Sequence, residues 1–230
     1  MKPLTLIPVA LLLAACGGGG GSSPAPAAPT PPKSVLIDAQ GDSTMCGYNG
    51  LVCDLVAAPP AVLQSILQAK LGPDVHVVNN GVPGATLSYD LYGFAGYYTT
   101  PIATRLSTSS AQIVIENFAL NDAVHSIPSQ YRIDLGLWVD TVRAMGKIPV
   151  LEEPNPATFD SPVLDSLVAI IDDVAQQKGV ALIQQYQYVK SLPNYKAMMV
   201  DGVHPGPELY AIKAQREADV LLPIVEGLQK

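Results

Sequence analysis

The sequence predicts an α/β protein in which helices cover both faces of a five-stranded parallel sheet, a three-layer α/β/α sandwich. Short apolar runs alternate with longer stretches in which apolar residues recur at helical spacing. The short runs are continuous rather than alternating, which is typical of strands buried on both faces. Polar clusters follow several of these runs, and in an open α/β sheet the carboxyl ends of the strands form the ligand-binding edge.

Residues 1–15 precede this domain and have the features of a secretory signal peptide. Lys2 supplies a positive charge, and a short apolar stretch ends in small residues. The stretch is shorter than the roughly 20 apolar residues that a membrane-spanning helix needs. Its end, Leu13-Ala14-Ala15-Cys16, resembles the bacterial lipobox, in which the cysteine becomes the lipidated first residue of the mature protein. An ordinary signal peptide with a chance cysteine is the alternative.

Residues 16–33 are expected to form a tether that begins at the lipidated Cys16. Five glycines and two serines are followed by Ala, Pro and Thr, with no apolar periodicity that would build a core. Gly/Ser sequences are flexible and Pro-rich sequences are extended, so this stretch would hold a domain away from a surface. We therefore expect an exported protein of the bacterial cell envelope, anchored by lipid to a membrane in the periplasm or at the cell surface.

Residues 34–230 are of a size that forms one domain with a single core. The formal net charge of the chain is -7, and no block of like charges occurs. A nucleic-acid partner would require a clustered basic face, which the sequence lacks.

The first half of the domain contains two strand patterns and one clear helix. Residues 34–40 contain the apolar run Val35-Leu36-Ile37 and form a buried strand that leads into a Gly turn, and residues 75–79 form a second strand that enters a glycine-rich loop. Between them, apolar residues at helical spacing over 62–71 end at a Gly-Pro pair. Residues 89–101 are aromatic and irregular, and are expected either to line a substrate surface or to pack over the core as a loop.

The second half continues the alternation after a short helix at 102–106. Strand, helix, strand, helix, strand and helix are predicted over 112–118, 131–145, 148–151, 162–178, 180–183 and 207–229. Gly146 is a suitable stop for the first of these helices. Ser161 caps the second helix and Pro162 occupies its first position.

Two cysteines, Cys46 and Cys53, lie within the loop that follows the first strand. An exported domain folds in an oxidising compartment, so a local disulfide is the leading interpretation. Two buried free thiols are the alternative. A metal site is not expected, because no histidine lies near the pair in the sequence.

Ser43 and His204 are the candidate nucleophile and base. Ser43 follows the first strand on a sharp turn, and a serine hydroxyl needs a base to become a useful nucleophile. His204 follows Asp201 by three residues across a glycine-containing turn, so that the carboxylate can hold one ring nitrogen. Alone, such an Asp-x-x-His sequence is common in loops.

An acyl-transfer site also needs donors that stabilise a negatively charged oxygen. The candidates for this oxyanion hole are the backbone N–H groups of Ser43 and Gly81 and the side-chain amide of Asn121. Each is ordinary by itself, because Asn-Gly and Asn-Asp sequences usually form turns. The order and spacing of the four features together are much less common.

These four features resemble the conserved blocks of the SGNH (GDSL-type) hydrolases. The matching blocks are Gly41-Asp42-Ser43, Asn80-Gly81, Ala119-Leu120-Asn121-Asp122 and Asp201-Gly202-Val203-His204-Pro205. The resemblance implies a flavodoxin-like fold with strand order 2-1-3-4-5. It also implies Ser43 as nucleophile, His204 as base, Asp201 as its orienting carboxylate, and no metal or other cofactor.

Two residues depart from the family pattern. Thr44 stands where leucine usually follows the serine, and Ala119 replaces the glycine that usually opens the third block. An alanine methyl shifts a loop whose backbone needs a positive φ, so Ala119 is expected to affect the direction in which the Asn121 side chain points.

The resemblance implies a serine esterase that hydrolyses acyl esters, expected to be short acyl groups such as O-acetyl on envelope or extracellular carbohydrate. Lipase-like or thioesterase-like activity and transfer of the acyl group to an alcohol use the same residues. A lipoprotein that keeps the fold only to bind a ligand is the alternative from another class. A paired-carboxylate glycosidase site at Glu152 and Glu153 is not favoured, because adjacent strand-end residues point apart.

Overall fold

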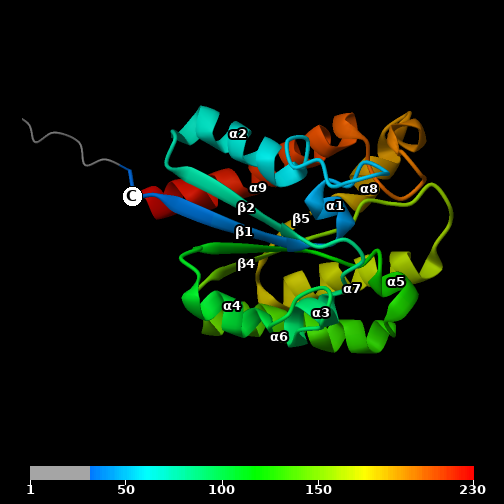
Figure 1. Cartoon of the computed structure of the whole chain (residues 1–230), viewed down its shortest axis with the longest axis horizontal. Helices are drawn as coiled ribbons and strands as arrows, with labels where there is room; N and C mark the ends of the chain where they lie inside the picture. The colour runs from blue at the N-terminus through cyan, green and yellow to red at the C-terminus, as the bar shows by residue number, and fades with distance from the viewer. Residues whose placement is uncertain (1–31) are drawn as a thin grey trace, which may run out of the picture. The chain divides into compact units, whose positions relative to one another are not determined.

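A computed structural model of the chain describes residues 32–230, which form one compact unit (Figure 1). The predicted signal peptide, the lipidation of Cys16 and nearly all of the tether lie outside the described residues. Within the described part, no helix is both long and apolar enough to cross a membrane.

Five parallel strands form a single sheet in the order β2-β1-β3-β4-β5, which confirms the predicted fold class. The strands are β1 (Val35–Gly41), β2 (Val75–Gly81), β3 (Ile113–Asn117), β4 (Ile148–Glu152) and β5 (Ala181–Ile183). Their register pairs Gly41 with both Gly81 and Asn117. The carboxyl ends of the three strands β2, β1 and β3 therefore meet at one edge of the sheet.

Helices cover both faces of this sheet, as Figure 1 shows. On one face, α2 (Pro59–Leu71) and α9 (Pro207–Gln229) pack together and bury side chains such as Leu63 and Leu221 against Ile37 of β1. On the other face lie α3 (Leu87–Tyr92), α4 (Ile102–Thr108), α6 (Pro128–Ala144) and α7 (Pro162–Lys178). Their core includes the fully buried Trp138 of α6.

The short helices differ from the expectation. The aromatic stretch predicted to be irregular begins inside α3, which Thr86 caps by accepting a hydrogen bond from the backbone N–H of Tyr89. Three more short helices, α1 (Ser43–Cys46), α5 (Asp122–His125) and α8 (Tyr186–Ser191), directly follow strands, and η1 (Tyr195–Met198) is a single 3-10 turn. Helices of one or two turns carry too few apolar repeats to be recognised by periodicity.

Candidate active site

The end of β1 presents Ser43 at the first position of α1. Asp42 caps this helix, because its carboxylate accepts hydrogen bonds from the backbone N–H of Thr44 at 2.8 Å and from its hydroxyl at 2.9 Å. Gly41 permits the turn, since a Cβ there would lie 2.7 Å from the carbonyl oxygen of Asn117. Ser43 itself is 8% exposed, so its hydroxyl reaches the surface only at the bottom of a pocket.

His204 and Asp201 lie in line with this hydroxyl. Ser43 Oγ is 2.8 Å from His204 Nε2, and His204 Nδ1 is 2.7 Å from Asp201 Oδ2. Chain segments 161 residues apart therefore meet within hydrogen-bond distance. These are the distances that a nucleophile, its base and the base's orienting group require.

Asp201 is held by the backbone of its own loop. Its Oδ1 accepts hydrogen bonds from the N–H groups of Val203 and His204, at 3.0 and 2.9 Å. Partial burial raises the pKa of Asp201, but the hydrogen bonds from His204 and Val203 outweigh this and leave the pKa below its ordinary value. The carboxylate is therefore charged at neutral pH and can balance a positive imidazolium.

Cys46 and Cys53 form the predicted disulfide, which closes the loop after the nucleophile. Within this loop the Tyr48 ring packs on the His204 imidazole, with the ring centroids 4.7 Å apart. The Tyr48 carbonyl accepts a hydrogen bond from the hydroxyl of Tyr210 on α9. No sequence pattern indicates the Tyr48–His204 contact, because the two residues come from distant loops.

The predicted oxyanion donors are arranged differently from the expectation. The N–H of Gly81 donates to Asn79 Oδ1 at 3.0 Å, so in this structure it is already bonded. Asn121 Nδ2 donates to the carbonyl of Ala85 at 2.9 Å, which places the Asn121 amide beside the loop that carries Gly84. Among the described residues, the Gly84 N–H forms no hydrogen bond. Gly84 is therefore a candidate donor that the sequence prediction did not include.

Gly81 has a packing role instead. A Cβ at this position would lie 2.4 Å from the backbone nitrogen of Cys46 and 2.8 Å from the carbonyl carbon of Met45. Only glycine lets the end of β2 approach the backbone of α1 so closely. The glycine of the Asn80-Gly81 block thus supports the helix that carries Ser43.

Ala119 adopts a φ of 94°, and it is the single non-glycine residue with positive φ among residues 32–230. The strained residue is fully buried and is held from both sides. Its N–H donates to Asp122 Oδ2 at 3.1 Å, and its carbonyl accepts from the N–H of Ala123 at 2.8 Å. The loop that aims Asn121 therefore keeps the conformation that favours glycine, despite the alanine.

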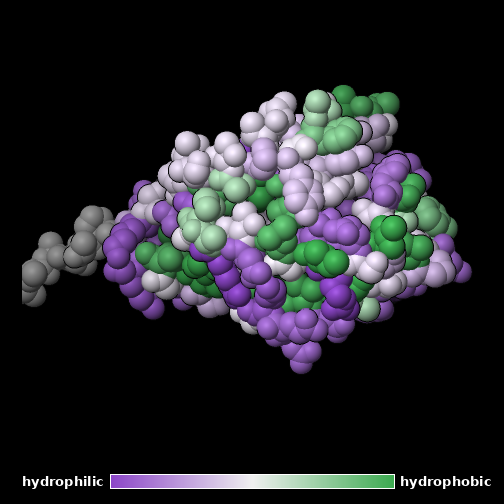
Figure 2. All heavy atoms as spheres, turned by 90° about the horizontal axis from the view of Figure 1, so that it is seen from below, coloured by the Kyte–Doolittle hydropathy of each residue, from purple (hydrophilic) through white to green (hydrophobic). Residues whose placement is uncertain are grey.

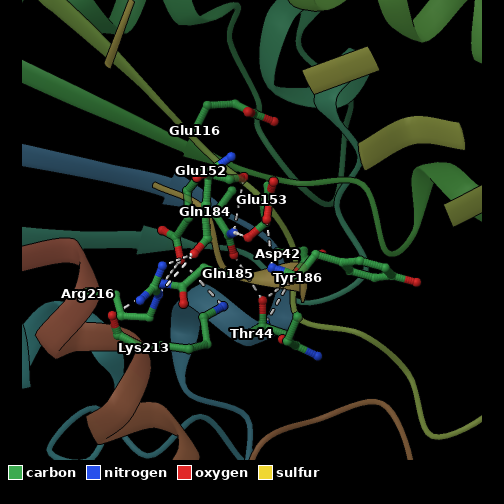
Figure 3. A network of polar contacts seen from close by, with 12 residues as sticks. Asp42, Thr44, Glu116, Glu152, Glu153, Gln184, Gln185, Tyr186, Lys213 and Arg216 are labelled. Atoms are coloured by element: carbon green, nitrogen blue, oxygen red, sulfur yellow. Dashed lines mark hydrogen bonds and ion pairs between the residues drawn. The ribbon is translucent and has the colours of Figure 1, made fainter. Parts of the chain in front are cut away.

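A buried polar network joins the turn that carries Ser43 to the ends of β3 and β4 (Figure 3). The Thr44 hydroxyl lies 3.1 Å from Asn117 Oδ1, and Asn117 Nδ2 donates to the carbonyl of Glu153 at 3.0 Å. Glu152 meets Lys213 of α9 at 3.5 Å. Thr44, the first departure from the family pattern, therefore gains polar partners that a leucine would lack.

Glu152 and Glu153 point to different partners, as expected of adjacent strand-end residues. Glu152 Oε1 accepts from Gln185 Nε2 at 3.1 Å, whereas Glu153 Oε2 accepts from the N–H of Tyr186 at 2.7 Å. Burial, together with the neighbouring Asp172 carboxylate, raises the pKa of Glu153 to about 7 against the lowering effect of the hydrogen bond from the N–H of Tyr186. The two carboxyl groups do not face a common substrate.

A pocket of about 240 Å³ opens at Ser43, between Asn121 and His204. Most of the side chains around it are apolar, including Leu120, Ala157 and Leu164. Across residues 32–230, the pocket included, no group of three or more His, Cys, Asp and Glu side chains is arranged to hold a metal ion.

The parallel sheet, the Ser–His–Asp alignment at its carboxyl edge and the adjoining pocket have the arrangement expected of an α/β hydrolase. The model of the GDSL-like lipase/acylhydrolase family matches residues 39–212. That range contains all four sequence blocks, and the chain belongs to this family.

Solved structures share the fold at low sequence identity. A Clostridium thermocellum family 3 carbohydrate esterase has a TM-score of 0.69 and 16% identity, covering 86% of this chain and 100% of that chain. The lipase/acylhydrolase from Enterococcus faecalis has a TM-score of 0.67 and 19% identity, and the match covers 83% of this chain and 96% of that chain. The psychrotrophic esterase EstA from a Pseudoalteromonas species has a TM-score of 0.63 and 15% identity, and the match covers 83% of this chain and 98% of that chain. No curated protein sequence matches the chain.

Proposed function

We propose that the protein is a serine esterase that hydrolyses carboxylic esters through an acyl-enzyme at Ser43. The alignment of Ser43, His204 and Asp201, with distances of 2.8 and 2.7 Å between successive partners, carries the proposal. Family membership supports a hydrolase, and the alignment supports acyl transfer to an alcohol nucleophile.

In the first half of the reaction, His204 Nε2 takes the proton of Ser43 Oγ as the oxygen attacks the ester carbonyl. The negative charge that develops on the carbonyl oxygen is stabilised by the N–H groups of Ser43 and Gly84 and by the amide of Asn121. His204 then gives its proton to the leaving alcohol, and the acyl group stays on Ser43. In the second half, His204 takes a proton from a water molecule that attacks this ester, and the bond between the acyl carbon and Ser43 Oγ breaks. His204 returns its proton to Ser43 Oγ, and the free acid leaves.

Asp201 acts on His204 rather than on the substrate. Its hydrogen bond to Nδ1 fixes the tautomer in which Nε2 is free to accept the serine proton. The bonded carboxylate stays ionised, because its pKa lies below the ordinary value. It thereby stabilises the imidazolium that forms in each half-reaction.

Hydrolysis of p-nitrophenyl acetate by the purified domain tests this function. Ser43→Ala is expected to lower kcat by at least about a thousandfold, since the nucleophile is lost while the fold remains. A fluorophosphonate probe should label the wild type and leave Ser43→Ala unlabelled. Equal hydrolysis by the two proteins would refute the assignment. A wild type that ignores the probe but binds ligands would favour the non-catalytic binding module.

We propose acyl esters as the substrate class, with two competing candidates. Short acyl groups, including O-acetyl groups on envelope or extracellular carbohydrate, are supported by the fold shared with a carbohydrate esterase, and lipidic esters or thioesters by the fold shared with a lipase/acylhydrolase. Transfer of the acyl group to an added alcohol uses the same residues. Comparing free acid with new ester in the presence of methanol measures that transfer.

We also propose that Cys16 is lipidated and anchors the protein to a membrane of the cell envelope. The support is the Leu13-Ala14-Ala15-Cys16 sequence and the low-complexity stretch after it. Labelled palmitate should enter the wild type and be absent from Cys16→Ala, which should also leave the membrane fraction. An unlabelled variant that stays with the membrane would contradict the anchor.

A further inference from the structure

The pocket at Ser43 has a composition that selects against sugars. The polar side chains around it are those of Ser43, Asn121, His204 and Ser161, and no Asp, Glu, Lys or Arg is among its lining residues. Ser161 is already engaged, because its hydroxyl caps α7 by accepting from the N–H of Leu164. Apart from the reacting groups, the Ser161 hydroxyl is the one polar side-chain group that the pocket lining offers to a ligand, so the pocket suits a hydrocarbon better than a sugar.

Its size sets the length of that hydrocarbon. A methylene group fills about as much space as a water molecule in the liquid, roughly 30 Å³. The pocket volume of about 240 Å³ therefore accommodates a chain of about six to eight carbons. An acetyl group would leave most of the pocket unfilled.

The wall of the pocket comes from two loops at the carboxyl edge of the sheet. Leu120 and Val124 approach from the end of β3, while Ala157 and Phe159 approach from the segment between β4 and α7. Val124 is 77% exposed and Phe159 is 60% exposed, so these side chains form an apolar rim around the entrance. Figure 2, seen from the side of α3 to α6, shows apolar surface at the end of the domain where α5 lies.

The half-enclosed pocket is better suited to the acyl group than to the alcohol. The acyl group stays bound to Ser43 through both half-reactions, whereas the alcohol must leave before water can attack. We propose, on the basis of the ester hydrolysis proposed above, that this pocket holds a medium-length acyl chain of about six to eight carbons, with Ala157 and Phe159 forming part of its wall.

Two ester series test this assignment. In the first, p-nitrophenyl esters vary the acyl chain from C2 to C12, and kcat/KM is expected to rise about threefold to fourfold per methylene up to about C8. In the second, acetate esters vary the alcohol over the same lengths, and kcat/KM is expected to stay nearly flat. A peak in the alcohol series instead would assign the pocket to the alcohol and overturn the acyl assignment.

Substitutions in the pocket wall test whether the pocket determines the preference for acyl chain length. Ala157→Leu should lower the ratio of C8 to C2 kcat/KM by at least about tenfold, because its extra carbons occupy the space of about three methylenes. Phe159→Ala should move the optimum to longer chains by removing part of the wall. Ala169→Leu on the exposed side of α7 adds the same side chain outside the pocket and should keep the wild-type profile.

The outcomes separate the two proposals. An active wild type that prefers C2, with a profile unchanged in Ala157→Leu, would overturn the acyl pocket and leave ester hydrolysis standing. A wild type inert toward every ester and toward the fluorophosphonate probe would remove the function on which the pocket depends. Thermal melting of each variant establishes that a changed profile comes from a folded protein.

Discussion

At the residue scale, Ala119 is the clearest conflict between local preference and fold. A non-glycine residue at a φ of 94° costs about 1–3 kcal/mol, yet this loop presents Asn121 to the pocket. The methyl is fully buried, which returns about 0.8 kcal/mol. Glycine would remove the strain but would lose this burial and about 0.5–1 kcal/mol of backbone entropy.

Ala119→Gly is therefore expected to be nearly neutral, within about 1 kcal/mol of the wild type in free energy of unfolding. Ala214→Gly is the matched control, because Ala214 is equally buried but lies in the helix α9. That variant should lose about 2 kcal/mol, from helix propensity and the lost methyl. Urea unfolding measures the free energy of unfolding of both variants. Equal losses in the two variants would show that Ala119 stores no strain.

At the element scale, the approach of β2 to α1 decides where the nucleophile lies. Gly81→Ala is expected to cost about 1–3 kcal/mol and to lower kcat, because the new Cβ collides with the backbone of the helix that carries Ser43. Gly72→Ala is the control. Gly72 has a φ of 95° and open space around it, so its variant suffers backbone strain without a collision.

Urea unfolding and the rate of fluorophosphonate labelling separate these two glycine variants. Both are expected to be less stable than the wild type, and only Gly81→Ala should react more slowly while folded. Normal labelling of folded Gly81→Ala would contradict the view that this contact positions α1.

The elements also explain what the sequence could predict. The five strands were predictable because each contains a short apolar run between breakers. Ser43 and His204 were proposed from motifs that are local in sequence, and the structure places Ser43 Oγ 2.8 Å from His204 Nε2. Gly81 was proposed as a donor from the Asn80-Gly81 sequence alone, whereas the structure shows that its N–H, at the end of β2, donates to the Asn79 side chain. The Tyr48 contact required the folded loops, since no sequence pattern joins positions so far apart.

At the scale of the whole molecule, buried carboxyl groups make stability depend on pH in an unusual direction. Burial raises the pKa of Asp90 and of Asp122 to about 6, and that of Glu153 to about 7. Hydrogen bonds and the Arg105 charge beside Asp90 offset only part of this effect. Each group holds its proton more tightly in the folded state than in the unfolded chain, so stability falls as pH rises through these values.

The direction in which the free energy of unfolding changes with pH follows from proton binding. Below the unfolded pKa of about 4, both states are protonated and the folded state keeps its full stability. As the pH rises toward 7, the unfolded chain releases protons that the folded state retains, and the free energy of unfolding decreases. Asp201 has a lowered pKa and works in the opposite direction, but it is half exposed and contributes little.

The protein is therefore expected to be more stable near pH 5 than near pH 8, with Glu153 contributing on the order of 2–3 kcal/mol of the difference. Glu153→Gln removes the titrating group and keeps an oxygen that can accept from the N–H of Tyr186. Its stability should change less between the two pH values, as measured by urea unfolding at each. Glu226→Gln alters an exposed carboxylate of α9 and should keep the wild-type difference. If Glu153→Gln also keeps that difference, the burial of Glu153 does not govern how the stability of this domain depends on pH.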